Sequence, residues 1–335
     1  MFQPAKLPAP LKKLARSFTQ PRVPKEISAR YRDISPSGMR AIEASLRQHY
    51  FTTSDTCHDN NYLSSDQGRA DLEAHLHRRV DKFRNTVIPW LDDARSLKGA
   101  KILEIGCGTG SSTVALAEQG AVVTAVDIVE SSLNVARDRC NVYDVSADFI
   151  CANATEVHKI CKSNDFDFII FFAALEHMIH HERMIAMKNT WDMLSPGNLW
   201  CVMRTPNRLW YYDGHTSRLP FYLWLPDDLA FSYSRFSPRK PFGDLYREMN
   251  EESKLDFLRR GRGVSFHEFE LTMKRAEDLD VVSSLPLFLR NQHILNLAVW
   301  SLTGQRRFES DLIRVGPKIH RGFYQGSLDL IIRKD

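Results

Sequence analysis

Apolar and polar positions divide the middle of the chain into short runs of two kinds. The apolar runs predict strands at residues 101–105, 122–126, 148–152, 166–172 and 199–204. The stretches between them predict helices at 112–119, 131–139 and 181–194. The run at 166–172 is apolar without interruption, which is typical of a strand inside a parallel sheet. Strands that alternate with helices predict a doubly wound, Rossmann-like α/β sheet.

The pattern continues on both sides of this core. Helices are predicted upstream at 38–50 and 67–95, with Asp66 as the N-cap of the second. A helix from Ser265 and strands at 281–284 and 326–333 bring the sheet to seven strands. We therefore expect five parts: a basic, proline-containing tail (1–30), an N-terminal helical cover (31–98), the cofactor-binding half of the core (99–206), an aromatic lid insertion after the fifth strand (207–262), and the rest of the core with a second, partly helical insertion (263–335).

Prolines interrupt both the tail and the lid. The tail is either an arm on the surface or a targeting or membrane-surface segment. In the lid, prolines separate many aromatic side chains, so short helices are expected there rather than one long loop. Three further aromatics, Tyr50, Phe51 and Tyr62, lie between the upstream helices, where they either pack in the core or close over a site.

A glycine-rich turn follows the first core strand. It reads Glu104-Ile105-Gly106-Cys107-Gly108-Thr109-Gly110 and enters a helix at Ser111. A dinucleotide fingerprint needs a third glycine one position later, where Ser111 stands. The turn instead resembles the first motif of the class I S-adenosylmethionine-dependent methyltransferases, E/D-x-G-x-G-x-G. Asp127 after the second strand, Leu175-Glu176-His177 and Leu194-Ser195-Pro196-Gly197 extend this resemblance.

The resemblance implies S-adenosylmethionine as the cofactor and S-adenosylhomocysteine as its product. Glu104 would engage the ammonium of the methionine tail, directly or through water, and Asp127 would accept hydrogen bonds from both ribose hydroxyls. Asn153 would pair with the adenine edge between Ile128 and Ala154. The turn itself would pass against the cofactor through Gly106, Cys107, Gly108 and Gly110.

The acceptor is expected at the carboxyl ends of the fourth and fifth strands, where ligands of parallel sheets bind. His177 is the first candidate for a general base, although a histidine that only orients its loop fits the sequence equally well. Asp213 and His215 are further catalytic candidates. Candidates for acceptor binding are Glu176, Trp210, Tyr211 and Tyr212.

Ubiquinone-biosynthesis O-methyltransferases and small-RNA 2′-O-methyltransferases look similar in carrying E-x-x-E-H after the fourth strand and binding a divalent ion there. This chain departs from them because Ala173 occupies the first glutamate position. We therefore predict no metal. Glu176, His177 and His215 remain the alternative ligand set.

Charge and composition indicate which partners and which cellular location to expect. A net charge of +4 from 45 basic and 41 acidic residues does not indicate a nucleic-acid partner. The six cysteines form no C-x-x-C pair, no apolar run reaches the length of a membrane span, and no secretory signal is recognised, so a cytoplasmic protein is expected. The apolar surface of the insertions is compatible with a homodimer.

These observations predict methyl transfer to a small or medium-sized organic acceptor, in small-molecule biosynthesis and most readily at oxygen. Two alternatives stay open. An RNA-modifying methyltransferase would use basic residues of the lid, and a non-catalytic cofactor-binding scaffold would keep the turn without the chemistry.

Overall fold

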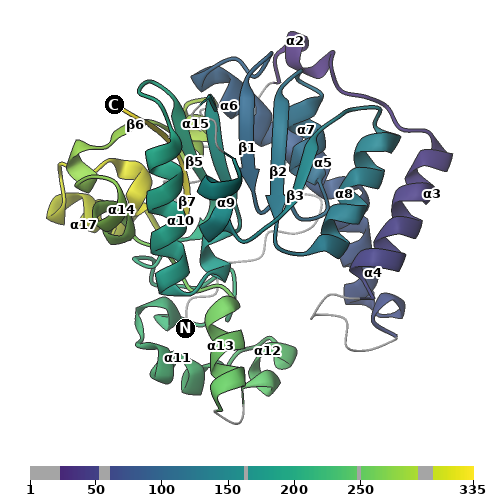
Figure 1. Cartoon of the computed structure of the whole chain (residues 1–335). Coiled ribbons are helices and arrows are strands. Elements are labelled where there is room, and N and C mark those ends of the chain that lie inside the picture. Colours follow the sequence, from purple (N-terminus) through teal and green to yellow (C-terminus); the bar gives the residue numbers. More distant parts are fainter. Residues whose placement is uncertain (1–22, 53–60, 162–164, 247–249, 293–304) are drawn as a thin grey trace.

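The seven predicted strands form one sheet in the order β3-β2-β1-β4-β5-β7-β6 (Figure 1). The computed structural model describes residues 23–52, 61–161, 165–246, 250–292 and 305–335. The strands are β1 (Lys101–Ile105), β2 (Val122–Asp127), β3 (Asp148–Cys151), β4 (Phe168–Phe172), β5 (Leu199–Pro206), β6 (Asp280–Ser284) and β7 (Ser327–Arg333). β1 to β5 pair in parallel, whereas β7 runs antiparallel to β5 and β6. The predicted sheet is confirmed, with strand ends shifted by one or two residues.

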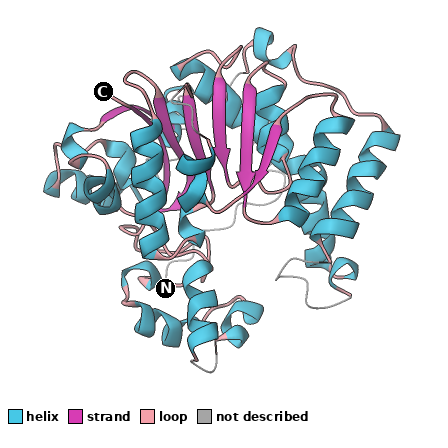
Figure 2. Ribbon diagram, in the orientation of Figure 1, coloured by secondary structure: helices cyan, strands magenta, loops and turns pink. Residues whose placement is uncertain are grey.

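Helices cover both faces of the sheet (Figure 2). The core helices are α7 (Ser111–Ala117), α8 (Glu130–Val142), α9 (Val157–Ile160), α10 (His180–Met193), α14 (Phe266–Thr272), α15 (Leu285–Gln292) and α17 (Gln305–Val315). Short 3₁₀ turns lie at Ala154–Glu156, Leu175–His177, Ala276–Asp278 and Arg321–Tyr324. Ser265 caps α14 together with Glu268, as a capping box.

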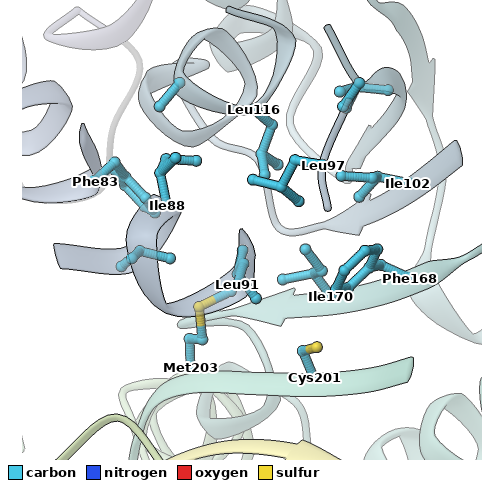
Figure 3. Close-up of a cluster of buried hydrophobic side chains, with 14 of the residues drawn as sticks. Phe83, Ile88, Leu91, Leu97, Ile102, Leu116, Phe168, Ile170, Cys201 and Met203 are labelled. Atoms are coloured by element: carbon cyan, nitrogen blue, oxygen red, sulfur yellow. The ribbon is translucent and has the colours of Figure 1, made fainter. Parts of the chain in front are cut away.

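Alternate residues of each strand enter two different cores, because side chains of a strand point to opposite faces. Ile102 and Ile170 belong to the first cluster, which the cover and α7 complete (Figure 3). Leu103 and Ile169 belong to the second, which packs against α9, α10 and α14. Both faces of β4 are buried, which explains its unbroken apolar run.

The N-terminal cover is helical over most of its described length. Its helices are α3 (Pro36–Ser45), α4 (Asp66–Glu73), α5 (Arg79–Lys82) and α6 (Ile88–Ala94), and α2 (Lys25–Ser28) precedes them at the end of the tail. π-Helical turns at Leu46–Tyr50, Ala74–Arg78 and Phe83–Val87 join them into the two predicted helices. One detail of the prediction is wrong: Ser65, not Asp66, is the N-cap of α4, since its hydroxyl accepts from the Gly68 N–H. Most of the tail, residues 1–22, lies outside the described residues, as does Cys57.

The insertion after β5 forms a small helical lobe at the carboxyl ends of the strands (Figure 1). It contains a 3₁₀ turn (Tyr222–Trp224), α11 (Asp227–Ser234), α12 (Lys240–Leu245) and α13 (Glu251–Arg259), so the expected short helices are present. Aromatic side chains, among them Tyr222, Phe231 and Phe257, pack on one another as a separate core. The insertion begins and ends at one place, because Asn207 and Val264 form a parallel β-bridge.

Within the described residues, no helix combines the length and apolar character that crossing a lipid bilayer requires.

Candidate active site

The glycine turn joins the end of β1 to the start of α7 in a backbone conformation that residues with a side chain rarely adopt. Gly106 and Gly110 have positive φ angles of 83° and 78°. A Cβ on Gly106 would lie 2.7 Å from the Cβ of Ala174, and one on Gly110 would lie 2.8 Å from the Cα of Ala136. The first glycine thus lets the turn approach the end of β4, and the second lets α7 approach α8.

The turn borders a cavity of about 580 Å³ at the carboxyl ends of the strands. The ends of β1, β2, β4 and β5 contribute Ile105, Asp127, Phe172 and Arg204 to its wall, together with Gly106, Cys107 and Gly108 of the turn. A Cβ on Gly108 would meet no atom within 4 Å. Gly108 therefore presents bare backbone to the cavity.

Asp127, Ile128, Asn153 and Ala154 gather along one wall of this cavity. Asp127 Oδ2 accepts from the Gly108 N–H at 2.8 Å, and burial raises the pKa of this carboxyl. Asn153 Oδ1 accepts from the N–H of Thr155, which leaves the amide NH₂ as the group that can read an adenine edge. Ile128 is 61% exposed and Ala154 is buried, so both can contact a planar ring.

Two predicted cofactor residues lie outside the lining of the cavity. Glu104 is fully buried and accepts from the hydroxyls of Ser112 and Thr113. It therefore holds the start of α7. Gly110 lies against α8 and serves helix packing. Both positions support the turn, and their part in cofactor binding stays a prediction.

His177 and His215 line the cavity as well, and the buried Glu176 lies behind them. One ligand-type atom of each lies within 4.8 Å of the other two. Glu176 is fully buried; its Oε2 accepts from the Thr205 hydroxyl at 3.0 Å, and its Oε1 has no hydrogen-bond partner among the described residues. That Oε1 lies 3.8 Å from His215 Nε2. Burial lowers the pKa of His215, although the Glu176 carboxylate opposes this shift.

Hydrogen bonds select the tautomers of both histidines. His177 Nδ1 lies 2.8 Å from the carbonyl oxygen of Arg259, so Nδ1 must carry the proton and donate. The Thr216 hydroxyl donates to the Gly261 carbonyl at 2.9 Å, so it accepts from His215 Nδ1 at 3.0 Å. Each neutral ring then has its lone pair on Nε2. Two imidazole lone pairs and an unpartnered carboxylate oxygen therefore converge.

This donor set fits a divalent cation. Oxygen and imidazole nitrogen are ligands that such ions use, and a buried carboxylate oxygen without a donor is costly unless something pairs with it. The replacement at Ala173 removes one ligand type of the relatives but leaves these three side chains together. The absence of a metal stays a prediction, and the three residues are its concrete alternative.

Four predicted acceptor residues are placed differently from expectation. Asp213 is buried, and its carboxylate accepts from the backbone N–H groups of His215, Thr216 and Ser217. It shapes the loop that carries His215. Trp210 and Tyr211 pack against Phe308, and Tyr212 pairs with Pro220 in an isolated bridge. None of the four lines the main cavity, and their contact with an acceptor stays a prediction.

Sequence reasoning missed several lining residues, among them Arg79 from α5 and Arg204 from β5. Tyr50, which was considered as a closing residue, also lines the cavity. Arg204 had a weak signal, since a charge ends an apolar strand. Arg79 had none, because it is one of several basic residues on a helix far from the motif. Phe51 packs on His75, and Tyr62 donates to Asp71.

The cavity fits an S-adenosyl cofactor. The Ser111 hydroxyl borders it and is buried without a hydrogen-bond partner among the described residues. Asp127 and Asn153 offer polar atoms on the strands beside the turn, as a ribose and an adenine require. A glycine turn after β1, an acid after β2 and this strand order define a Rossmann-like cofactor-binding fold.

Comparison with known proteins narrows the class. Residues 102–197 match a family described as a methyltransferase domain. Ubiquinone biosynthesis O-methyltransferase of Coxiella burnetii is 33% identical over 110 residues, 33% of this chain and 45% of that protein. The Pseudomonas aeruginosa enzyme of the same name is 34% identical over 118 residues, 32% of this chain and 50% of that protein. The chain spans about half the length of these curated relatives.

Solved structures give weaker matches. Magnesium protoporphyrin IX methyltransferase from Synechocystis PCC 6803 is 20% identical, with a TM-score of 0.36, and the match covers 50% of this chain and 74% of that one. A methyltransferase from Methanosarcina mazei is 25% identical, with a TM-score of 0.32 and coverage of 36% and 58%. Residues 102–197 therefore form a methyltransferase domain by this match, and the strand order of the sheet agrees with it.

Proposed function

We propose that the protein transfers a methyl group from S-adenosylmethionine to an oxygen atom of a small or medium-sized organic acceptor. One continuous cavity carries this proposal: its lining includes Gly108 and Asp127 together with His177 and His215. Cofactor and acceptor can meet there in line, as displacement at the sulfonium carbon requires. The curated relatives are named as O-methyltransferases, which supports oxygen as the acceptor atom.

In this reaction the S–CH₃ bond breaks, an O–CH₃ bond forms and the hydroxyl proton leaves. We assign that proton to His215 Nε2, because the Glu176 carboxylate 3.8 Å away stabilises the resulting imidazolium. Burial lowers the pKa of His215, so its ring is neutral near pH 7 and able to accept. His177, held by the Arg259 carbonyl, orients the acceptor.

A divalent ion held by Glu176, His177 and His215 would lower the pKa of an acceptor hydroxyl as a Lewis acid. Metal analysis of the purified protein, with Glu176→Gln as the control, decides whether these residues bind one. Bound Mg²⁺, Mn²⁺ or Zn²⁺ that the variant loses would establish the site. Equal metal content in wild type and variant would show that Glu176 binds no metal, and its carboxylate would then act only on His215.

The reaction is tested with methyl-labelled S-adenosylmethionine and fractionated metabolite extracts, with labelled products identified by mass. His215→Asn should lower the rate by a factor of about 10² to 10⁴, the usual contribution of a general base. Its affinity for S-adenosylhomocysteine should stay unchanged. His181→Asn, on the exposed start of α10, is the matched control and should retain the wild-type rate.

The two alternatives make different predictions. A scaffold would bind S-adenosylhomocysteine and label no product in any extract. An RNA-modifying enzyme would bind RNA with an affinity that falls steeply with salt. Three of the lid arginines argue against RNA, because Arg259, Arg260 and Arg262 form ion pairs with Glu182, Asp256 and Asp227.

A further inference from the structure

Two arginines that form no ion pair among the described residues line the cavity. Arg79 comes from α5 in the cover, and Arg204 comes from the end of β5. Lys82, one turn along from Arg79, adds a third positive charge beside Arg204. Within the described residues, none of these three side chains forms an ion pair or a hydrogen bond.

Two acidic residues close to these side chains, Asp329 and Asp71, accept hydrogen bonds from other groups. Asp329 is buried and accepts from the backbone N–H of Arg204 at 2.7 Å. Asp71 accepts from the Tyr62 hydroxyl. Burial, followed by the charge of Arg204, lowers the pKa of Arg79, and the same two causes lower that of Lys82. Tyr50, Asp71 and Asp329 offset these positive charges in part, but within the described residues none of the three forms an ion pair with Arg79 or Arg204, so both guanidinium groups that line the cavity remain open to an anion.

The backbone holds Arg204 in this position against its own preference. Its φ angle is 60°, in the left-handed region that residues with a side chain avoid. The hydrogen bond to Asp329 stabilises this conformation, at a shift in the register between β5 and β7. Strain of this kind persists at sites where a side chain must point in one direction. Here that direction is the cavity.

The side chains around Arg204 indicate that part of its ligand is apolar. Its guanidinium carbon lies 6.0 Å from the ring centroid of Phe172, and that ring lies 4.5 Å from the ring of Phe83. Both rings line the cavity. An apolar wall next to unpaired guanidinium groups suits a molecule with an apolar body and an anionic group.

We propose that Arg79 and Arg204 bind a carboxylate or phosphate group of the methyl acceptor, which makes the substrate an organic anion. This inference rests on the proposed function, since it concerns the acceptor of that reaction. The sheet order supports the acceptor rather than the cofactor as the source of the anion. Asp127 and Asn153 follow β2 and β3, whereas Arg204 ends β5, on the opposite side of β1 and β4.

The test uses the full chain saturated with S-adenosylhomocysteine and three probes: benzoate, inorganic phosphate and the neutral benzamide. Calorimetry should show saturable binding of benzoate or phosphate and much weaker binding of benzamide. Arg79→Gln and Arg204→Gln should each weaken the anion by about tenfold or more, as expected for a lost charge-assisted hydrogen bond. Arg204→Lys keeps the charge and should retain most of the binding.

Arg314→Gln is the control, because this arginine on α17 is 81% exposed and lies outside the cavity lining. Equal binding of benzoate and benzamide by the loaded wild type would overturn the inference. So would a tenfold loss of S-adenosylhomocysteine affinity in Arg204→Gln, because the arginine would then hold the methionine carboxylate. A wild-type chain that binds no S-adenosylhomocysteine would instead contradict the proposed function itself.

Discussion

One oxygen atom of the buried Glu176 side chain has no hydrogen-bond donor in the part of the chain that the structure describes, and this affects the groups around it. Its Oε2 is held by Thr205, while its Oε1 remains without a hydrogen-bond donor among the described residues. An unpartnered buried carboxylate oxygen costs free energy unless a proton or a cation approaches it. His215 is the nearest group that can acquire positive charge. In the proposed mechanism, this pair would accept the proton of the acceptor hydroxyl.

The pH dependence of the rate should follow His215. Burial lowers its pKa below the usual 6.5, and only the neutral ring can accept a proton. The rate should thus rise with pH below about 6.5 and level off above it. We expect kcat/KM profiles to show this limb in the wild type. Glu176→Gln should lower the rate and move the limb to still lower pH; an unmoved limb would contradict the assignment.

Glu104 should make stability depend on pH. Burial raises its pKa to about 7, against the Ser112 and Thr113 hydrogen bonds, whereas an unfolded glutamate titrates near 4.5. The folded state then binds more protons between these values, so stability falls as pH rises through this window, by on the order of 1–3 kcal/mol. Glu104→Gln should flatten urea-unfolding stability between pH 5 and 8. An equal slope in wild type and variant would show that other groups cause it.

At the scale of elements, the sequence predicted most of the secondary structure but not which groups most side chains contact. Strand period and apolar runs predicted every strand of the sheet, because burial of one or both faces dictates them. The uses of Asp213 and Trp210 were not predictable. Whether a polar loop residue faces a ligand or its own backbone depends on tertiary contacts that one sequence does not reveal. Asp213 turned inward because three N–H groups of its loop needed an acceptor.

The packing of α7 on α8 should fail if Gly110 gains a side chain. Gly110→Ala places a Cβ 2.8 Å from Ala136 and forces alanine to a φ of 78°. Gly197→Ala is the matched control, because Gly197 has a similar φ of 87° but nothing within 4 Å. Thermal unfolding should show a loss of about 1 kcal/mol for the control and several kcal/mol for Gly110→Ala. Equal losses would mean that backbone strain alone matters.

At the scale of the whole molecule, the cavity is built by parts far apart in sequence. The cover supplies Tyr50 and Arg79, the core supplies the turn, and the lid supplies His215 and Arg259. The buried Arg139 ties two of these parts together by donating to the carbonyls of Thr109 and His75. The motif predicted the core contribution, while the others follow only from the assembled fold.

Cofactor binding should stabilise this assembly. At a hundredfold excess over its dissociation constant, S-adenosylhomocysteine should add about 2.7 kcal/mol and raise the melting temperature by a few degrees. Asp127→Asn should lose most of this shift, because a neutral amide replaces the carboxylate at the expected ribose. Asp148→Asn, at the exposed start of neighbouring β3, should keep it. A wild type that shows no shift would contradict the cofactor assignment.

The β-bridge between Asn207 and Val264 has a consequence for engineering and divergence. The lobe that it closes leaves and re-enters the sheet through adjacent backbone positions, with Arg208 N–H bonded to Val264 O at 2.8 Å and Val264 N–H to Pro206 O at 2.9 Å. Its aromatic side chains pack mainly on one another. A lobe with this connection could be exchanged at the same two residues without rebuilding the half that holds the methyl donor, provided that the incoming lobe supplies a group in place of His215.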